Sequence, residues 1–443
     1  MKAKGLFIIL ILILTVLSGC TKSVETTEVT EAVNGEETTA AAATEKEPVT
    51  LTMLMHDALM YEYFTETNSI SEAYKKVAPH VTIEVEKAKD SGQMEETLKI
   101  RYSANELPDL MLIKPYMLAD FKDGLADLSD TQASKTNQFA ASYAVEGKVV
   151  GIPETAFYEF VYYNKSIFTE LGLEIPTTWD QFIEASLKIK ESGKYIPIAM
   201  GAKDSWPVYP FNEFMPSLEA AKGDYWNIMT TQETPFSAGE PFYESYLKIK
   251  KLYEADVFGN DPLGIGWDQS KALFIAKEAA MIAAGQWFIS DYVASGADIA
   301  DLGMFLLPAR NTESDPFYAT VMADGFMSTP ADGENLDEVK AFIDWYFASE
   351  YYPAYLAVKG LGSTVEGMKV DLPYASQMEE AFSRQEVSYI LYDGGNIDFS
   401  NISNAIGFDV KKMGQEMLAG ENFDEMMSDL NEQWKKAKNE LKP

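Results

Sequence analysis

From Val49 onward, strand-like and helix-like segments alternate along the chain, and this alternation limits the fold more than any other feature. Apolar and polar residues alternate at 50–55 and, strictly, at 81–85, as in half-buried strands. Helical periodicity occupies 66–78 and 92–104. A nearly continuous apolar run at 109–113 fits a strand buried on both faces of a parallel sheet. The order strand, helix, strand, helix, strand predicts right-handed βαβ crossovers and an α/β fold.

The loops after two of these strands are the first candidate ligand contacts. In open α/β sheets, ligands lie beyond the carboxyl ends of the strands. His56 and Asp57 follow the strand that ends at Met55, and Lys114 to Tyr116 follow the strand that ends at Ile113. We expect these residues near a ligand; an ordinary solvated loop is the alternative interpretation of each.

A second α/β pattern occupies the rest of the chain. Apolar runs predict strands at 149–153, 160–163 and 279–285, and periodicity predicts helices at 244–254, 268–277, 336–347 and 409–441. Thr178 to Gln181 has the form of a capping box, so we expect a helix to begin there. No repeat of fixed period and no low-complexity linker interrupts this part of the chain. Two α/β lobes joined by direct chain crossings therefore fit better than two domains on a flexible linker.

The N-terminus has the form of an export signal. Lys2 and Lys4 precede an apolar run from Leu6 to Leu17, which is shorter than the ~20 residues that a membrane-spanning helix needs. Cys20, the only cysteine, ends a Leu-Ser-Gly-Cys sequence that resembles the bacterial lipobox. We expect residues 1–19 to be a lipoprotein signal peptide and Cys20 to carry the lipid. A plain secretory signal with an incidental cysteine is the alternative.

Residues 20–48 are expected to be a disordered tether. The segment is rich in Thr, Glu and Ala and has no aromatic residue, so it cannot bury enough surface to offset its ordering entropy. The simplest interpretation is a folded body held by an acidic tether on the extracellular face of the cytoplasmic membrane, in a Gram-positive-type envelope.

Composition excludes several classes of function. With 69 acidic and 36 basic residues, the formal net charge is −33, so binding to nucleic acid is not expected. One cysteine rules out an internal disulfide and a multi-cysteine zinc site, and two histidines, His56 and His80, argue against a His-rich metal centre. The only arginines are Arg101, Arg310 and Arg384, which disfavours an arginine clamp for phosphate. No cofactor and no metal ion is predicted.

Five short motifs occur in an order typical of one protein family. They are Leu107–Leu110 (LPDL), Gly147–Pro153 (GKVVGIP), Tyr162–Leu173 (YYNKSIFTELGL), Pro176–Phe182 (PTTWDQF) and Ala279–Trp287 (AAMIAAGQW). In this order, behind a lipobox, they resemble the family 1 extracellular solute-binding proteins, which deliver carbohydrates to ATP-driven importers. The sequence departs from the family pattern at Val150, where Tyr is more usual, and at Gln286, where Ser or Asn is more usual.

The resemblance implies a two-lobe periplasmic-binding-protein fold, similar to type II. The first lobe would comprise 49–156 plus 318–352, and the second lobe 157–317 plus 353–443. The ligand would lie in the cleft between the lobes, and its binding would close a hinge. The closed form, a monomer, would be the one that the permease of an ABC transporter recognises.

A carbohydrate needs aromatic surfaces for its C–H faces and planar polar groups for its hydroxyls. Trp287 is the leading candidate, because it follows a glycine at the end of a buried strand and the family's cleft tryptophan maps onto it; a core position is the alternative. Trp206 and Trp267 lie in loop-like segments, where a large aromatic side chain has little reason to serve the core. The other candidate ligand contacts are Tyr116, Glu154, Gln286, His56, Asp324 and Asp393. Both aspartates precede glycine, so plain turns are the alternative there.

Three interpretations of the function remain open. The main one is a lipid-anchored carbohydrate-binding protein without catalysis. A secreted glycoside hydrolase would need two carboxyl groups at a defined separation, one with a raised pKa, and so acidic a chain places some carboxyl pair close together whatever its function. The third is the same scaffold used for a solute other than sugar; the few arginines disfavour phosphorylated or carboxylated ligands.

Overall fold

The computed structural model describes residues 46–372 and 374–441. The predicted signal peptide, the predicted lipidation site at Cys20 and most of the predicted tether lie outside the described residues. From Glu47 onward, the described chain forms one compact unit. No helix in these residues is both long enough and apolar enough to cross a membrane.

The strands of this unit hydrogen-bond in the order β2-β1-β3-β8-β4-β6-β5, with β7 added to β4 and β9 added to β8. β1 pairs in parallel with both β2 and β3, as the predicted βαβ crossovers require. All four residues of β3 are buried, which confirms a strand covered on both faces. The strands are β1 (Val49–Met55), β2 (Val81–Lys87), β3 (Leu110–Ile113), β4 (Ile152–Asn164), β5 (Ile196–Ala199), β6 (Ala279–Gly285), β7 (Leu302–Leu306), β8 (Phe317–Ser328) and β9 (Val387–Tyr392).

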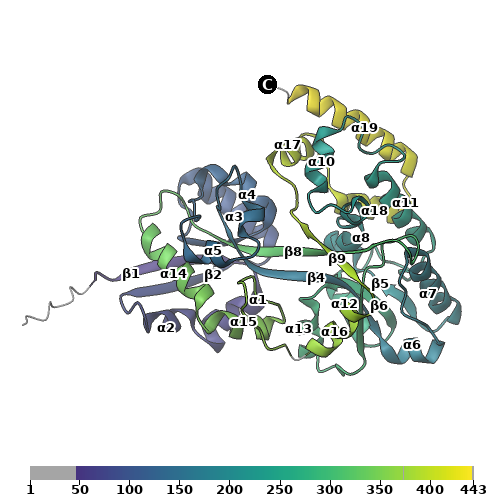
Figure 1. The fold of residues 1–443 in the computed structure, drawn as a ribbon, viewed down its shortest axis with the longest axis horizontal. Helices are drawn as coiled ribbons and strands as arrows, with labels where there is room; N and C mark the ends of the chain where they lie inside the picture. Colours follow the sequence, from purple (N-terminus) through teal and green to yellow (C-terminus); the bar gives the residue numbers. More distant parts are fainter. Residues whose placement is uncertain (1–45, 373, 442–443) are drawn as a thin grey trace, which may run out of the picture. The chain divides into compact units, whose positions relative to one another are not determined.

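Two strands belong to both halves of the sheet. The first part of β4 pairs with β8, and its second part pairs with β6 and β7. The end of β8 pairs with β3, and its beginning pairs with β9. Figure 1 shows β4 and β8 side by side between two groups of helices. These strands are the chain crossings between two α/β lobes, so the predicted fold class is confirmed.

The length of β4 corrects the prediction of separate strands at 149–153 and 160–163. Pro153 suggested an early strand end, because proline offers no N–H to a sheet. In the structure Pro153 lies inside β4, and its carbonyl oxygen accepts hydrogen bonds from the Asn137 amide (2.8 Å) and the Thr364 hydroxyl (2.9 Å). Side chains from elsewhere in the chain therefore supply hydrogen bonds at this irregular position.

The helices of the first lobe come from the chain before β4 and from the chain after β8. They are α1 (Ala58–Glu62), α2 (Ile70–Lys75), α3 (Ser91–Ala104), α4 (Pro115–Asp120), α5 (Gln132–Thr136), α14 (Leu336–Ala348) and α15 (Tyr351–Lys359). Tyr355, Leu356 and Leu361 are buried in the same core as β1 and β3. Helix α15 and the residues just after it therefore pack in the core that contains β1 and β3.

The second lobe contains the remaining helices. They are α6 (Lys165–Leu171), α7 (Trp179–Ser192), α8 (Tyr209–Asn212), α9 (Met215–Ala220), α10 (Tyr225–Thr231), α11 (Pro241–Glu254), α12 (Trp267–Ile275), α13 (Phe288–Ala294), α16 (Ala375–Ser383), α17 (Ile397–Ile406), α18 (Val410–Leu418) and α19 (Phe423–Glu440). Helix α7 begins where the capping-box pattern predicts, with the Thr178 side chain accepting from the N–H of Gln181 (3.3 Å).

Two predicted helices are interrupted. The segment 409–441 forms two helices rather than one, because Gly420 adopts a φ of +85°, a left-handed conformation that ends helices. The segment 66–78 contains only α2, preceded by a π-helical turn, η1 (Tyr63–Thr67). There the Ser69 side chain accepts from the N–H of Glu72 (3.3 Å) and so starts the helix at Ile70.

Candidate functional site

Charged side chains gather where the strands of the first lobe end. His56 and Asp57 follow β1, Lys114 follows β3, and Asp324 lies in β8. The ammonium of Lys114 lies 2.7 Å from Oδ2 of Asp324. Lys359, the last residue of α15, places its ammonium 2.5 Å from Oδ2 of Asp57. We call these five residues the charged cluster.

The charged cluster is electrically balanced. Burial alone would raise the pKa of Asp57, but the ammonium of Lys359 lowers it to about 2. Burial likewise opposes ionisation of Asp324, and the neighbouring Lys114 ammonium outweighs it, so the pKa of Asp324 is lowered. Burial, together with the charge of Lys114, lowers the pKa of His56 to about 4, so this imidazole is neutral at neutral pH. Two cations therefore face two anions, and the cluster carries no net charge.

Glu154, in β4, is electrostatically coupled to this cluster and is fully buried. Its Oε1 accepts a hydrogen bond from the Tyr346 hydroxyl (3.0 Å). Burial raises the pKa of Glu154 to about 7, although the ammonium of Lys359 acts in the opposite direction. Within the part of the chain that the structure describes, Oε2 of Glu154, Oδ1 of Asp324 and Nδ1 of His56 are buried without a hydrogen-bond partner. Buried polar atoms usually have partners, so these three atoms are hydrogen-bonding groups that the described part of the chain leaves unsatisfied.

Three tryptophans gather in the second lobe. Trp206 begins the short turn η5 (Trp206–Val208), Trp267 begins α12, and Trp287 follows β6. Their ring centroids are 4.9 Å (206–267), 5.8 Å (206–287) and 5.4 Å (267–287) apart, with interplanar angles of 53°, 58° and 63°. All three side chains are partly exposed. We call them the tryptophan triad; their tilted rings form one aromatic surface rather than a stack.

The crossing strands provide an apolar floor between the triad and the charged cluster. Phe157 of β4 pairs with Met322 of β8, and Met322 lies two residues from Asp324, so both β8 side chains point to one face. Met322 and Trp287 each pack against the cores of both lobes. Trp287 also adjoins Phe157: a Cβ on Gly285 would come within 2.3 Å of the Trp287 ring and 3.0 Å of the Phe157 ring. The glycine before Gln286 therefore permits this close approach.

Two residues that are candidate ligand contacts, Tyr116 and Gln286, form hydrogen bonds with other parts of the protein. Tyr116 is 46% exposed, and its hydroxyl donates to Oε2 of Glu95 (3.0 Å). Gln286 is 1% exposed, and its amide donates to the carbonyl oxygen of Gly360 (3.0 Å). The Gln286 side chain thus joins the end of β6 to the segment after α15.

Asp393 also has partners outside the triad and the charged cluster. Its carboxylate accepts from the Asn227 amide (2.6 Å) and from the N–H of Gly395 (2.9 Å). Burial raises the pKa of Asp393 to about 6 against the effect of these hydrogen bonds. This carboxylate therefore fixes the turn after β9 to α10.

Sequence reasoning missed Lys359, Phe157 and Met322. Phe157 was not predicted, because the sequence pattern indicates separate strands at 149–153 and 160–163 and leaves residue 157 between them. Met322 would have followed from recognising 317–328 as one strand whose alternate residues share a face with Asp324. Lys359 carries no local signal, since a lysine at the end of a helix is common on protein surfaces.

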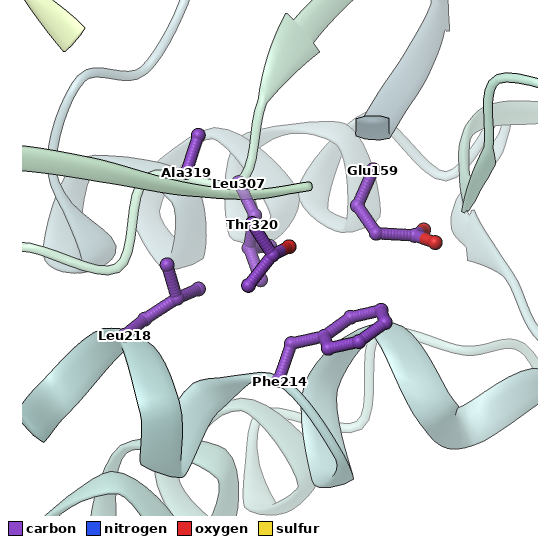
Figure 2. A pocket seen from close by; sticks show the side chains of 6 residues that line it. All are labelled: Glu159, Phe214, Leu218, Leu307, Ala319 and Thr320. Carbon is purple, nitrogen blue, oxygen red and sulfur yellow. The ribbon is translucent and has the colours of Figure 1, made fainter. Parts of the chain in front are cut away.

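Two hollows lie away from these residues. One is a cavity of about 10 Å³ lined by Glu159, Phe214, Leu218, Leu307, Ala319 and Thr320. Figure 2 shows Phe214 and Leu218 approaching it from the helical side, and the Thr320 side chain from β8. The other is a groove of about 500 Å³ formed by the C-terminal segment 406–433. The first is far too small for a sugar, and neither contains a predicted ligand contact.

Two α/β lobes joined by crossing strands, with indoles on one lobe and a balanced charged cluster on the other, define a two-lobe solute-binding protein. A family model described as bacterial extracellular solute-binding protein matches residues 57–353, and the chain belongs to this family. The family indicated by the five motifs is thereby confirmed.

Relatives and solved structures agree with this assignment. The chain is 24% identical over 337 residues to the multiple sugar-binding protein of Streptococcus mutans, covering 71% of this chain and 77% of that protein. It is 22% identical over 326 residues to the melibiose/raffinose/stachyose-binding protein MelE of Bacillus subtilis, covering 71% and 75%. The structure of RafE in complex with raffinose matches with a TM-score of 0.72 at 23% identity, covering 88% of this chain and 100% of that chain.

Proposed function

We propose that this protein captures a neutral mono- or oligosaccharide between the tryptophan triad and the charged cluster, and delivers it to the permease of an ABC importer. The observation that carries this proposal is the combination of an exposed indole surface with a balanced polar cluster that has unpaired atoms. Indoles suit the C–H faces of a sugar ring, while carboxylate and imidazole atoms suit its hydroxyls. The sugar-binding names of the two relatives support the same ligand class.

The charge balance favours a neutral ligand over a charged one. The ammonium groups of Lys114 and Lys359 are already paired with Asp324 and Asp57. An anionic ligand would have to compete with these carboxylates. A hydroxyl would instead bond to Oδ1 of Asp324 or Nδ1 of His56 without breaking a pair, once opening of the lobes exposes these atoms, which are buried in the structure.

We infer that the lobes close by bending at the two crossing strands. The first lobe would then comprise 49–156 plus 318 to about 361, on the packing of α15, and the second lobe the remaining body. Phe157 and Met322, within the crossings, would contact the ligand from below as Trp287 and Asp324 approach each other. The closed form would be the one that the permease recognises.

We also propose that no bond is made or broken at this site. A glycosidase needs a carboxylic acid that reaches the glycosidic oxygen. Glu154 has the raised pKa of such an acid, but it is 0% exposed and bonded to Tyr346. The carboxylates of Asp57 and Asp324 are each held by a lysine.

Our proposal for the location rests on the N-terminal sequence and on the family, whose members are extracellular. Residues 1–19 would be removed on export, and Cys20 would carry the lipid that holds the monomeric protein at the extracellular face of the cytoplasmic membrane. The acidic residues 20–48 would separate the folded body from the bilayer.

A thermal-shift screen tests the ligand class, because a ligand that binds only the folded state raises the melting temperature. The panel should include raffinose, melibiose, stachyose and simple monosaccharides, with uronic acids, amino acids and short peptides as comparison ligands. We expect a neutral sugar to give the largest shift, confirmed by calorimetry. A shift with peptides or uronic acids and none with neutral sugars would overturn the proposal.

A further inference from the structure

A buried glutamate lies behind the tryptophan triad and has no part in the site described above. Glu159 belongs to β4 and is 5% exposed. Its register partner in β6 is Gly285, which is separated from Trp287 only by Gln286. A carboxyl group in such a position needs a structural reason, because burying it is costly.

A hydrogen-bonded link through Tyr209 explains why the Glu159 carboxyl group is buried at this position. The Tyr209 hydroxyl donates to Oε1 of Glu159 (2.7 Å) and accepts from the N–H of Gly285 (2.9 Å). One hydroxyl thus joins the carboxyl group on β4 to the backbone that leads into Trp287.

Tyr209 also contacts the other side of the triad. Its ring centroid lies 6.1 Å from that of Trp206, which precedes it in the same loop and short helix. Trp206 in turn lies 5.8 Å from Trp287. Tyr209 is therefore linked to Trp206 through its ring and to the Trp287 segment through its hydroxyl.

The second oxygen of Glu159 does not contact the proposed ligand site. Oε2 is buried without a hydrogen-bond partner among the described residues, and Glu159 lines the cavity of about 10 Å³ together with Phe214 and Thr320 (Figure 2). Burial, with the nearby Glu213, raises the pKa of Glu159 well above its usual value, although the Tyr209 hydrogen bond opposes this. Oε1 of Glu159 accepts the hydrogen bond from the Tyr209 hydroxyl, a role that the carbonyl oxygen of a glutamine amide can also fill.

We propose that Glu159 is a positioning residue of the carbohydrate site, which fixes the spacing of Trp206 and Trp287 through the hydroxyl of Tyr209. This inference rests on the proposed function in so far as the triad binds the sugar. Without the hydroxyl, the Gly285 N–H and the Glu159 carboxyl would both lose a buried partner, and the backbone would shift to recover one. A shift of the backbone at Gly285 moves Trp287 relative to Trp206.

Three variants test the link. Tyr209→Phe removes the hydroxyl, Glu159→Met removes the acceptor at similar volume, and Glu159→Gln keeps the acceptor. We expect Tyr209→Phe and Glu159→Met to bind the tightest sugar of the panel about 10-fold more weakly, and Glu159→Gln to stay within about 3-fold of the wild type. Near-ultraviolet circular dichroism of the unliganded proteins, which reports coupling between close indoles, should change in the first two variants only.

Tyr225→Phe is the matched control. The Tyr225 hydroxyl also accepts a hydrogen bond from a buried backbone N–H, that of Phe242 (3.0 Å), but it joins α10 to α11 in the same lobe. We expect this control to lower the melting temperature as Tyr209→Phe does, while sugar affinity stays unchanged. Its near-ultraviolet spectrum should lose only the contribution of one tyrosine beside Trp226.

The double variant Tyr209→Phe with Glu159→Met should bind no more weakly than Tyr209→Phe alone, because Glu159 acts through Tyr209. Additive losses, a Glu159→Gln variant as weak as Glu159→Met, or an unchanged spectrum and affinity in Tyr209→Phe would each overturn the inference.

If Tyr209→Phe does not fold, the affinities and spectra of Glu159→Met and Glu159→Gln decide whether the acceptor at residue 159 positions the triad. If the wild type binds no sugar, the proposed function fails, while the spectra of the unliganded variants still decide whether the link positions the triad.

Discussion

The ammonium of Lys359 lies 2.5 Å from the carboxylate of Asp57, although 302 residues separate the two in the chain. The carbonyl oxygen of Lys359 also lies 2.7 Å from the hydroxyl of Ser290 in α13. Lys359 therefore contacts the charged cluster through its side chain and the second lobe through its backbone. The end of α15 joins the two lobes next to the candidate site.

Replacing Lys359 by methionine should destabilise the fold, because Asp57 would keep a partly buried charge without its partner. We expect a loss of about 2–3 kcal/mol in the free energy of unfolding at neutral pH, measured by urea denaturation. The pKa of Asp57 is lowered to about 2 in the folded state, against about 3.9 when unfolded. The stabilisation from this pair is therefore complete above pH ~4 and is lost as the pH falls toward 2.

Lys250→Met is the control for this change. Lys250 pairs with Glu254 at 2.5 Å on an exposed face of α11, and such pairs contribute less than about 0.5 kcal/mol. Equal stability of Lys359→Met and Lys250→Met would show that the Asp57 pair does not stabilise the fold.

Replacing Glu154 by glutamine should change how stability depends on pH. The folded-state pKa of Glu154 is raised to about 7, so the folded protein binds this proton more tightly than the unfolded chain does. Its contribution is complete below the unfolded pKa of ~4.3 and is lost as the pH rises through 7. Relative to the wild type, Glu154→Gln should gain on the order of 3–4 kcal/mol between pH ~4 and pH ~8.

Melting curves of the wild type and Glu154→Gln across this range check the prediction. The difference between the two proteins isolates Glu154 from other buried carboxyls such as Glu159. A difference that does not vary with pH would contradict the raised pKa of Glu154.

Replacing Trp287 by alanine should weaken sugar binding 10- to 100-fold, because aromatic stacking and burial against a sugar are worth about 1–3 kcal/mol. Calorimetry with the tightest sugar of the panel measures the loss. Trp345→Ala serves as the control, since Trp345 packs against Tyr74 and Tyr351 in the first lobe and should affect stability without changing affinity. Unchanged binding in Trp287→Ala would remove this residue from the site.

Replacing Cys20 by alanine should release the protein from the membrane fraction, because the proposed lipid is attached there. Cell fractionation followed by immunoblotting measures the distribution, and wild-type protein in the same cells is the reference. Retention of the variant in the membrane fraction would mean that another part of the chain anchors it.

The position of part of the candidate site could be predicted because a parallel βαβ unit determines which strand ends share an edge. His56, Asp57 and Lys114 meet there as expected. Lys359 could not be placed, since its position depends on α15 packing back onto the first lobe from a distant part of the chain.

The failures of sequence reasoning also have local physical causes. Pro153 suggested a strand end, yet Asn137 and Thr364, distant in sequence, supply hydrogen bonds to its carbonyl oxygen. Gly420 divides the last helix by its backbone conformation, although apolar periodicity continues across it.

Neither lobe is built from one uninterrupted stretch of polypeptide. The first core needs both Leu51 and Leu361, and the second needs both Val161 and Trp434. A nascent chain emerging from its N-terminus cannot complete either core until most of it has been synthesised, and such long-range contacts form slowly. Late folding of this kind suits a protein of an extracellular family, because its chain has to cross a membrane before it acts.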